Sequence, residues 1–317
     1  MKQERVLEIF FRCLRGENIS VKELAEEYNI STKSISRDIN DLKAFFADHR
    51  EIVGNSELQY SYQDKSYHLY MDEFLTDKEL FSLIEVLIGA RAFSKIELLS
   101  MIEKIKKFTT PNDRNRLYEL IRKELYHYPE IKHDCESVQD NLWQIIGAIN
   151  NKKEITIEYY RMDRKWVTHR ILPASVIFTD YYFYLIAFID GNNEKPYYFR
   201  VDRIKHITEH RKSQNTYSNF DEGELRQKSL FMMSGKLRKI RFEFSGLSVQ
   251  AVLDKIHTAK IIERLDSNKY LIEAETYGDG IKMWLLSQGS WVKVISPQDF
   301  VDEMKNEINL MINNYQY

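Results

Sequence analysis

The sequence is poor in the residues that mark secreted, membrane and metal-binding proteins. It has only two cysteines, Cys13 and Cys135, and neither has a partner nearby, so no disulfide framework and no zinc site is expected. No apolar run reaches the roughly 18 residues that a membrane span needs. The start, MKQERVLEIFFRC, lacks the residue order of a signal peptide. These absences predict a cytoplasmic protein without a membrane partner.

Motifs for catalysis are also missing. There is no glycine-rich phosphate loop, HExxH motif, nucleophile elbow or paired CxxC. The run His133-Asp134-Cys135 offers three ligand types, but neighbours in sequence point in different directions. Ser287-Gln288-Gly289 is better explained by a helix-to-strand turn than by a hydrolase. We therefore expect a protein that is not an enzyme, with no catalytic residue, cofactor or metal.

The remaining composition allows several small domains. A chain of 317 residues with 43% hydrophobic content can bury more than one core, and its length indicates two or three domains. The net charge of -2 argues against a wholly basic coating protein. Any positive charge that faces DNA must therefore be gathered locally.

The segment 19–46 has the spacing of a helix-turn-helix, which places a short helix in the DNA major groove. Ser20 and Ser31 can each cap a helix, and Asn29 with Ile30 suits the turn between them. The alternative is a helix pair inside a larger bundle. The positions expected to face inward are Leu24, Ala25, Tyr28, Ile35, Ile39 and Leu42.

Polar residues at the start of the second helix are the candidates for DNA contact, because hydroxyls and long cations there would enter the groove. Residues 59–70 alternate around a basic tip and predict a hairpin, the wing of a winged helix, with Lys65 and Tyr67 as candidate phosphate contacts. A preceding helix, 3–15, would bury Val6, Leu7, Phe10 and Leu14. The candidates on the second helix are Ser31, Thr32, Lys33, Ser34, Ser36 and Arg37.

The rest of the chain divides into three parts. Residues 73–150 predict a helical connector, whose apolar stripes are either internal core or in part a dimer surface. Residues 151–212 read as short antiparallel strands, with 12 basic residues against 8 acidic ones, and suggest a small β-barrel. Residues 213–317 run strand, helix, hairpin, helix, strand, the order of a ferredoxin-like α+β unit. With the winged helix-turn-helix of residues 1–72, we expect a multidomain α+β protein.

Phe183-Tyr184-Leu185 resembles the triplet that names the WYL family of bacterial transcription regulators. Three further motifs keep the family's order: Ile157-Glu158-Tyr159, Arg170-Ile171-Leu172-Pro173, and 198–204. Phe183 departs from the usual Trp, which keeps a ring and loses an indole donor.

The flanking regions are similar to this family as well. Ser36-Arg37-Asp38-Ile39 matches its winged helix-turn-helix, and the run 284–289 with Pro297 matches its C-terminal extension, so the resemblance covers nearly the whole chain. It implies an Sm-like barrel that binds a ligand and adjusts an attached DNA-binding domain. It also implies that the ligand is a single strand or a nucleotide messenger.

A groove with arginine beside tyrosine suits such a ligand, because guanidinium pairs with phosphate and rings stack on bases. Strand parity places Leu185 in the core and Tyr184 on the other face. Arg200 and Arg203 have opposite parity in a regular strand, so one can line the pocket while the other pairs with Asp202 or caps the barrel, unless a bulge intervenes. Arg170 is either a pocket cation or part of a surface ion pair. The ligand-binding candidates are Tyr159, Arg170, Tyr182, Tyr184, Tyr198, Arg200 and Arg203.

These features predict a ligand-responsive transcription regulator; they favour a repressor but do not decide between repression and activation. It would act as a homodimer on an operator in double-stranded DNA, and its barrel would sense a nucleotide or single-stranded nucleic-acid effector. The alternative is an accessory protein that binds single strands for a partner machine without binding an operator. A third reading is an enzyme acting on nucleotides.

Overall fold

The computed structural model describes residues 2–70, 77–106, 111–189, 192–212, 223, 227–228, 232 and 235–316. The expected helix cap at Thr76 and most of the expected turn at 190–192 lie outside these residues. The chain forms two compact units, residues 1–132 and 133–317.

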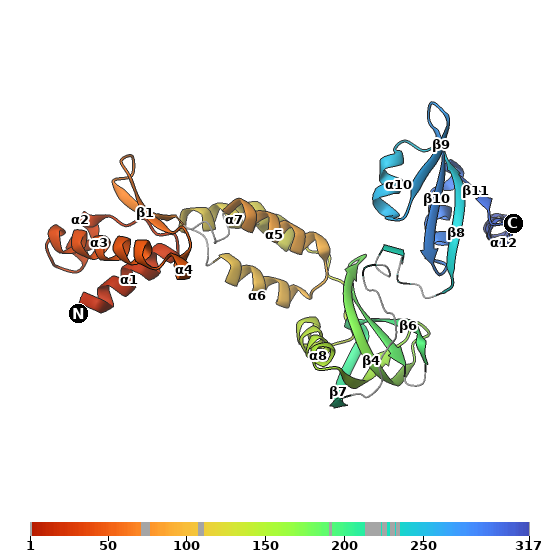
Figure 1. Ribbon diagram of the computed structural model, residues 1–317, viewed down its shortest axis with the longest axis horizontal. Coiled ribbons are helices and arrows are strands. Elements are labelled where there is room, and N and C mark those ends of the chain that lie inside the picture. The colour runs from red at the N-terminus through yellow and green to blue at the C-terminus, as the bar shows by residue number, and fades with distance from the viewer. Residues whose placement is uncertain are drawn as a thin grey trace. The chain divides into compact units, whose positions relative to one another are not determined.

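The first unit begins with four helices and a hairpin (Figure 1). Ile19 exchanges backbone hydrogen bonds with Tyr67 of the hairpin, at 2.9 and 2.8 Å, so the segment before the second helix is bound to the sheet. Together with the two-stranded hairpin this is the winged arrangement expected from the sequence. The elements are α1 (Lys2–Leu14), α2 (Val21–Glu27), α3 (Thr32–Asp48), α4 (Arg50–Val53), β1 (Glu57–Ser61) and β2 (Ser66–Tyr70).

A single apolar cluster holds these elements together. The expected inward residues of α2 and α3 are buried or half-buried, as the 3.6-residue period requires. In α1 the buried side chains are Ile9 and Cys13, with Val6 and Phe10 packed beside them. Leu7 is 57% exposed, so its predicted place in the core is wrong. The apolar stripe of α1 is wider than the surface that contacts α3. Only one side of the stripe is therefore buried, and Leu7 lies on the other side.

Three further helices complete the first unit: α5 (Asp77–Ala90), α6 (Lys95–Ile105) and α7 (Pro111–Tyr126). Ser94 and Glu97 form a capping box that begins α6, satisfying backbone N–H groups at both positions. Each helix buries one apolar stripe, with Ile84, Ile102 and Ile121 almost fully inaccessible. The helical connector expected between the DNA-binding region and the strands therefore has a core of its own.

The second unit begins with α8 (Val138–Asn150), which packs on a five-stranded antiparallel sheet. We expected this helix in the connector of residues 73–150, but its contacts are with the sheet. The strand order is β6-β5-β4-β3-β7. The strands are β3 (Lys153–Tyr160), β4 (Trp166–Thr179), β5 (Tyr182–Ile189), β6 (Asn192–Arg200) and β7 (Ile204–Lys212).

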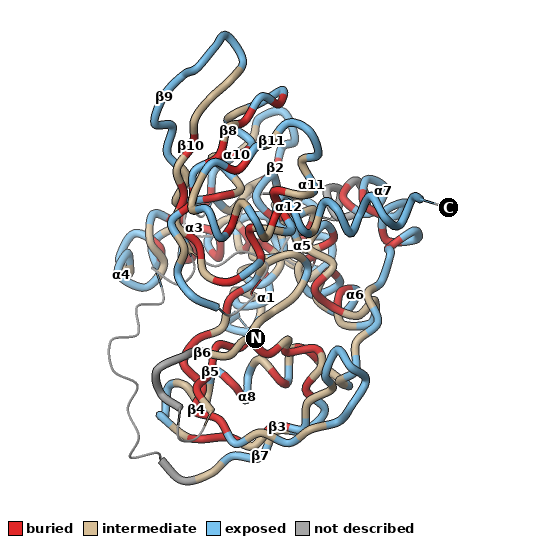
Figure 2. The backbone as a smooth tube through the Cα atoms, turned by 90° about the vertical axis from the view of Figure 1, so that its right-hand side faces the viewer, coloured by how far each residue is buried: buried red, intermediate tan, exposed pale blue. Residues whose placement is uncertain are grey.

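The C-terminal part contains a four-stranded antiparallel sheet with the order β11-β8-β10-β9. Phe242, Trp284 and Phe300 share its core. Strand β9 is an edge strand of this sheet, paired only with β10, and all of its residues are exposed (Figure 2). The elements are β8 (Leu237–Phe244), α10 (Val249–Lys255), β9 (Lys260–Asp266), β10 (Lys269–Tyr277), α11 (Gly280–Ser287), β11 (Val292–Ser296) and α12 (Gln298–Asn313).

Within the described part of the chain, no helix combines the length and the apolar character that crossing a membrane requires.

Candidate functional site

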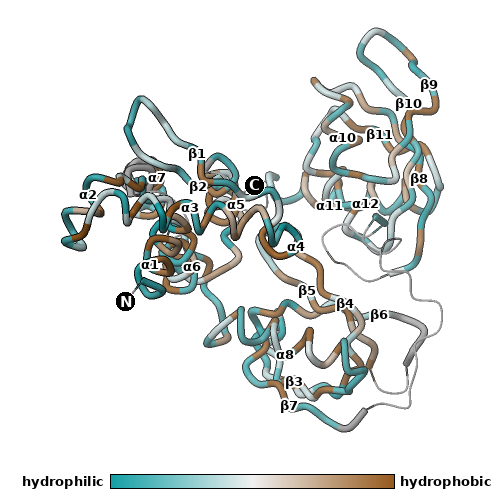
Figure 3. The backbone as a smooth tube through the Cα atoms, turned by 60° about the vertical axis from the view of Figure 1, so that its left-hand side comes forward, coloured by the Kyte–Doolittle hydropathy of each residue, from teal (hydrophilic) through white to brown (hydrophobic). Residues whose placement is uncertain are grey.

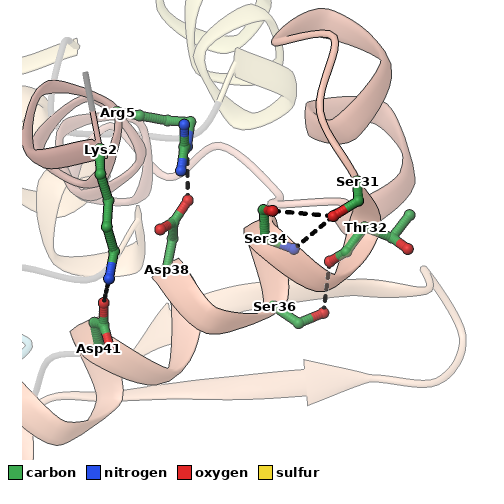
Figure 4. Close-up of polar contacts among 8 residues, drawn as sticks. All are labelled: Lys2, Arg5, Ser31, Thr32, Ser34, Ser36, Asp38 and Asp41. Carbon is green, nitrogen blue, oxygen red and sulfur yellow. Dashed lines mark hydrogen bonds and ion pairs between the residues drawn. The ribbon is translucent and has the colours of Figure 1, made fainter.

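The start of α3 is built by its cap. The Ser31 hydroxyl accepts a hydrogen bond from the Ser34 backbone N–H at 3.2 Å, and the two hydroxyl oxygens lie 3.0 Å apart (Figure 4). Asn29 has a φ of +53°, the left-handed conformation that the sequence predicted for the turn. Both features fix the direction in which α3 leaves the turn.

The first turns of α3 present free cations to solvent. Thr32, Lys33 and Arg37 are exposed, and neither cation forms an ion pair with any residue in the described ranges. The Ser36 hydroxyl donates to the Thr32 carbonyl oxygen at 3.0 Å, so it is engaged within the helix. Of the six polar candidates, Thr32, Lys33 and Arg37 are therefore the most available for an outside contact.

Two ion pairs hold α3 against α1 (Figure 4). The Arg5 Nε donates to the Asp38 Oδ2 at 2.6 Å, and the Lys2 Nζ lies 2.7 Å from the Asp41 Oδ2. Asp38 is buried, with 1% of its surface exposed. A carboxylate at a buried helix position needs a partner, and this need was a signal in the sequence that our reading of 36–39 did not use.

The two candidate DNA contacts on the wing differ in their exposure. Lys65 lies at the exposed tip with a φ of +52°, and the tip residues are hydrophilic (Figure 3). Tyr67 is half-buried against the core of the unit, and the Lys43 Nζ lies 4.5 Å from the centre of its ring. Tyr67 thus has a packing role in the structure, whereas Lys65 points its charge outward from the end of the hairpin.

In the second unit, three of the expected ligand residues meet on one face of β5 and β6. Tyr184 pairs with Arg200 across the two strands. The Arg200 guanidinium carbon lies 3.4 Å from the centre of the Tyr182 ring, in a cation–π contact. The rings of Tyr182 and Tyr184 meet edge to face at 6.4 Å. Tyr182 and Tyr184 thus share one face of β5, as strand parity predicted.

Arg200 is held by Asp202. The Arg200 Nε donates to Oδ1 at 3.0 Å and its Nη2 donates to Oδ2 at 2.6 Å. A guanidinium has five N–H groups, so this bidentate pair leaves the remaining ones for another acceptor. The regular strand assumed from the sequence is wrong here, because β6 ends at Arg200 and a 3-10 turn, η2 (Val201–Arg203), follows. The turn brings the carboxylate back onto Arg200.

Burial sets the electrostatics of this face. Burial raises the pKa of the Tyr184 hydroxyl, so that ring stays neutral. Burial opposes the charge of Arg200, but the hydrogen bonds and the charge of Asp202 outweigh it and leave the arginine pKa raised. The N–H groups of Arg200 that Asp202 does not engage lie beside aromatic rings, an arrangement suited to an anionic ligand with a flat apolar part.

The 3-10 turn is anchored by Asn141, which the sequence reading did not select, and by the backbone of Asp134 and Cys135. The buried Asn141 of α8 donates its Nδ2 to the carbonyl oxygens of Val201, at 3.3 Å, and Ile204, at 2.7 Å. The Asp202 carbonyl oxygen accepts hydrogen bonds from the backbone N–H groups of Asp134, at 2.9 Å, and Cys135, at 3.0 Å. An amide on the otherwise apolar buried face of α8 was the signal for this anchor.

Of the other ligand-binding candidates, two tyrosines lie near this face and two arginines do not join it. The Tyr159 hydroxyl accepts a hydrogen bond from the Arg200 backbone N–H at 3.4 Å, and Tyr198 packs near Tyr184. Arg170 forms a 2.7 Å ion pair with the buried Glu154. It lies seven residues from Ile177, the β4 partner of Tyr184, which is roughly 20 Å along a strand. Arg203 forms no hydrogen bond or cation–π contact with these tyrosines among the residues that the structure describes.

No group of three or more metal-ligating side chains occurs among the residues that the structure describes.

Comparisons with known proteins agree with this architecture. Residues 3–55 match an HTH domain and residues 140–209 match the WYL domain, which begins within α8. A search of curated proteins gave no match. Among solved structures, the chain is similar to proteasome accessory factor B/C (PafBC) of Arthrobacter aurescens, with 14% identity and a TM-score of 0.30. That match covers 100% of this chain and 48% of the other, so the chain spans about half the length of PafBC.

A second solved structure, described as a CRISPR Cas-related protein, has 17% identity and a TM-score of 0.40. The match covers 94% of this chain and 92% of that one. The two domain matches, in this order along the chain, indicate a DNA-binding regulator. The chain therefore carries an HTH domain followed by a WYL domain, which matches the arrangement of a WYL-domain regulator with a winged helix-turn-helix.

Proposed function

We propose that this protein is a ligand-responsive transcription regulator, acting in the cytoplasm as a repressor and without enzymatic activity. The observation that carries the proposal is the start of α3, where Lys33 and Arg37 are exposed on a capped helix and lack ion partners among the described residues. Cations in this position pair with phosphates on either side of the major groove, and the hydroxyl of Thr32 can reach a base edge. Lys65 on the wing would contact the adjacent backbone.

The test is a gel shift with the DNA upstream of the protein's own gene. The native protein should retard this fragment in the presence of excess unrelated DNA, and the variant Lys33→Ala/Arg37→Ala should not. The variant Lys104→Ala/Lys123→Ala removes the same charge from exposed positions of α6 and α7 and should bind normally. Equal binding by both variants would contradict the assignment of α3.

The effector is held by the face that contains Arg200, Tyr182 and Tyr184. A phosphate would accept hydrogen bonds from the edge of Arg200 that Asp202 leaves open, and a base would stack on a tyrosine. The effector can change repression only if the protein has two conformations that differ in DNA affinity and the effector binds one of them more tightly. Mass spectrometry of molecules released from the freshly purified, denatured protein should find a nucleotide or short oligonucleotide. Recovery of only phosphate-free compounds would contradict this class of effector.

Two finer features of the fold belong to the same proposal. The sheet of the WYL domain closes into a small Sm-like barrel, supported by the hydrogen bond from the β6 end to Tyr159 on β3, which curls the sheet. The C-terminal unit is ferredoxin-like, supported by the strand order β11-β8-β10-β9 with helices between the strands. An experimental structure of residues 133–317 would test both.

The protein acts as a homodimer, which would present two recognition helices to half-sites about 34–36 Å apart or at a multiple of that spacing. The end of α12 exposes Ile308, Met311, Ile312 and Tyr315 at helical spacing. Residues 306–316 carry a single charge, Glu307, so two copies of this segment can approach without strong repulsion. We therefore place the dimer interface at this stripe, with the stripe of one protomer packed on that of the other.

Light scattering should give a dimer mass for the native protein and a monomer mass for Ile308→Asp/Met311→Asp. Leu247→Asp changes a residue that is 88% exposed in a loop and should leave the mass unchanged. A dimer mass for both variants would show that the dimer interface does not include the end of α12.

A further inference from the structure

Helix α1 carries apolar residues on the side that faces solvent. Leu7 and Phe11 are 57% and 58% exposed, and Leu14 beside them is half-buried. Residues separated by four and then three positions lie on one face of a helix. Single exposed apolar residues are ordinary on a protein surface, but three along one helix face form a surface that can pack against a partner.

This face lies opposite the side of α1 that packs into the helix-turn-helix. Ile9 and Cys13 are buried in that core, and each is two positions along the chain from Leu7 or Phe11. Two positions correspond to about 200° around a helix axis, so the exposed residues point away from the core. A partner bound to them would therefore leave the contact between α1 and α3 intact.

The charges at the two ends of this face have opposite signs. Glu4 lies one turn before Leu7, and Arg15 directly follows Leu14. Both charged residues are exposed, and Arg15 forms no ion pair with any residue in the described ranges. From Glu4 to Leu14 the positions on this face follow the 3-4-3 spacing at which two helices pair.

We propose that this surface, the α1 stripe made of Glu4, Leu7, Phe11, Leu14 and Arg15, packs antiparallel on the α1 stripe of a second copy of the chain. Leu7 then lies against the partner's Phe11, and Glu4 lies beside the partner's Arg15. The same contacts recur with the protomers exchanged, as a two-fold axis requires. A parallel pairing would place Glu4 beside the partner's Glu4, so charge favours the antiparallel pairing.

The α1 pairing is small, so it adds to a dimer rather than forming one. Three turns of helix bury much less surface than a stable interface needs. Protomers that are already joined elsewhere hold their α1 stripes at a high effective concentration. A weak contact forms under that condition.

The pairing also sets the distance between the two recognition helices, a consequence that rests on the proposed operator binding. Because α3 and the α1 stripe lie on opposite sides of α1, the order across the pair is α3, α1, the partner's α1 and the partner's α3. Three helix contacts of about 8–10 Å each give roughly 24–30 Å between the two α3 axes. This distance is closer to half-sites one DNA turn apart, about 34–36 Å, than to a spacing of two turns.

Chemical cross-linking of the full chain tests whether the two stripes meet. In a Cys135→Ser background, Leu7→Cys should give a covalent dimer with a short bismaleimide, because the native Cys13 is 3% exposed and protected from the reagent. Ile52→Cys is the matched control, since Ile52 is 69% exposed on α4 of the same unit and should give no covalent dimer. A dimer mass by light scattering without a cross-link at Leu7→Cys, or equal cross-linking at both positions, would overturn the proposal.

Charge reversal tests the orientation of the pair. Glu4→Arg and Arg15→Glu should each slow the cross-linking of Leu7→Cys roughly tenfold, because each turns two attractive pairs into repulsive ones. The double variant Glu4→Arg/Arg15→Glu should restore the native rate. Its reversed charges oppose the helix dipole, so a more stable α1 could not explain the recovery. A double variant as slow as either single variant would overturn the antiparallel pairing.

Two further variants separate this proposal from the proposed function. Lys33→Ala/Arg37→Ala should lose operator binding and still cross-link through Leu7→Cys at the native rate. A chain that cross-links in this way without retarding the upstream DNA would support the α1 pairing and contradict the regulator. Ile308→Asp/Met311→Asp should cross-link slowly, because its protomers separate. Fast cross-linking in that variant would support the α1 pairing and contradict the interface at α12.

Discussion

The two units each contain a buried arginine–aspartate pair, and the pairs differ in what surrounds them. In the helix-turn-helix, the side chains of Arg5 and Asp38 are 18% and 1% exposed. In the WYL domain, those of Arg200 and Asp202 are 17% and 4% exposed. The burial is nearly the same, so burial alone does not distinguish a structural pair from a binding site.

The surroundings make the difference. Arg5 reaches Asp38 through one hydrogen bond between two helices, and this contact joins α1 to the helix that carries Lys33 and Arg37. Arg200 makes a two-hydrogen-bond contact and lies flat on the ring of Tyr182. The first pair orders a scaffold, whereas the second prepares a guanidinium whose free edge lies beside tyrosines. This difference in surroundings is the reason that we propose a ligand site at Arg200 and not at Arg5.

The largest expected effect is on stability, and it should be alike in the two units. Asp38→Ala and Asp202→Ala each leave a largely buried arginine unpaired, and each should lower the free energy of unfolding by about 3 kcal/mol. All four tryptophans, Trp143, Trp166, Trp284 and Trp291, lie in the second unit. Tryptophan fluorescence during urea unfolding should therefore report Asp202→Ala, and circular dichroism should report both variants. Changes below about 0.5 kcal/mol would show that the pairs are not structural.

Replacing both partners should separate the two pairs. Arg5→Met/Asp38→Leu and Arg200→Met/Asp202→Leu remove buried charge together, so each should stay within about 1 kcal/mol of the native stability. Only the second should weaken the binding of the effector recovered from the native protein, roughly tenfold, because it removes charge-assisted hydrogen bonds. Titration of both variants with that effector measures this. Equal weakening of effector binding by the two double variants would show that the Arg200 pair is no more a binding site than the Arg5 pair.

The buried thiol of α1 gives a smaller, pH-dependent effect. Burial raises the pKa of Cys13 from 9.0 to about 12, so the folded state disfavours the thiolate. The unfolded chain loses its proton at lower pH, so the first unit's stability is unaffected by Cys13 below about pH 9 and falls above it, by up to about 1.4 kcal/mol per pH unit. Urea unfolding of the native protein and Cys13→Ala at two alkaline pH values checks this. The same slope in both would contradict the assignment to Cys13.

The smallest effect concerns the cap of α3. Ser31→Ala should cost about 1 kcal/mol, because it leaves the Ser34 N–H without its hydroxyl partner. Ser36→Ala removes a hydroxyl that bonds back to Thr32 within the helix and should change stability by less than about 0.5 kcal/mol. Thermal unfolding followed by circular dichroism compares the two. A larger loss for Ser36→Ala would mean that the cap is not what begins the helix.

Local signals in the sequence predicted much of this structure. The helix pair expected at 19–46 and the hairpin expected at 59–70 are present in the structure, because apolar spacing, caps and turn residues define them locally. The caps Ser20 and Ser31 and the left-handed Asn29 are confirmed for the same reason.

Features that depend on tertiary packing were not predictable in this way. Leu7 fits the stripe of α1, but no element of the described unit covers it. The turn after Arg200 is held from outside by Asn141, so strand parity failed where a distant helix sets the backbone. The ligand candidates were predicted as residue types suited to phosphate and bases, and the structure joins Tyr182, Tyr184 and Arg200 while it pairs Arg170 with Glu154.

The salt dependence of DNA affinity tests the central claim most directly. If Lys33 and Arg37 each neutralise one phosphate, a plot of log affinity against log salt for upstream DNA should be shallower by about 1.8 in Lys33→Ala/Arg37→Ala than in the native protein. Lys104→Ala/Lys123→Ala should keep the native slope. An unchanged slope in Lys33→Ala/Arg37→Ala would contradict the account, since the start of α3 would then contact no phosphate.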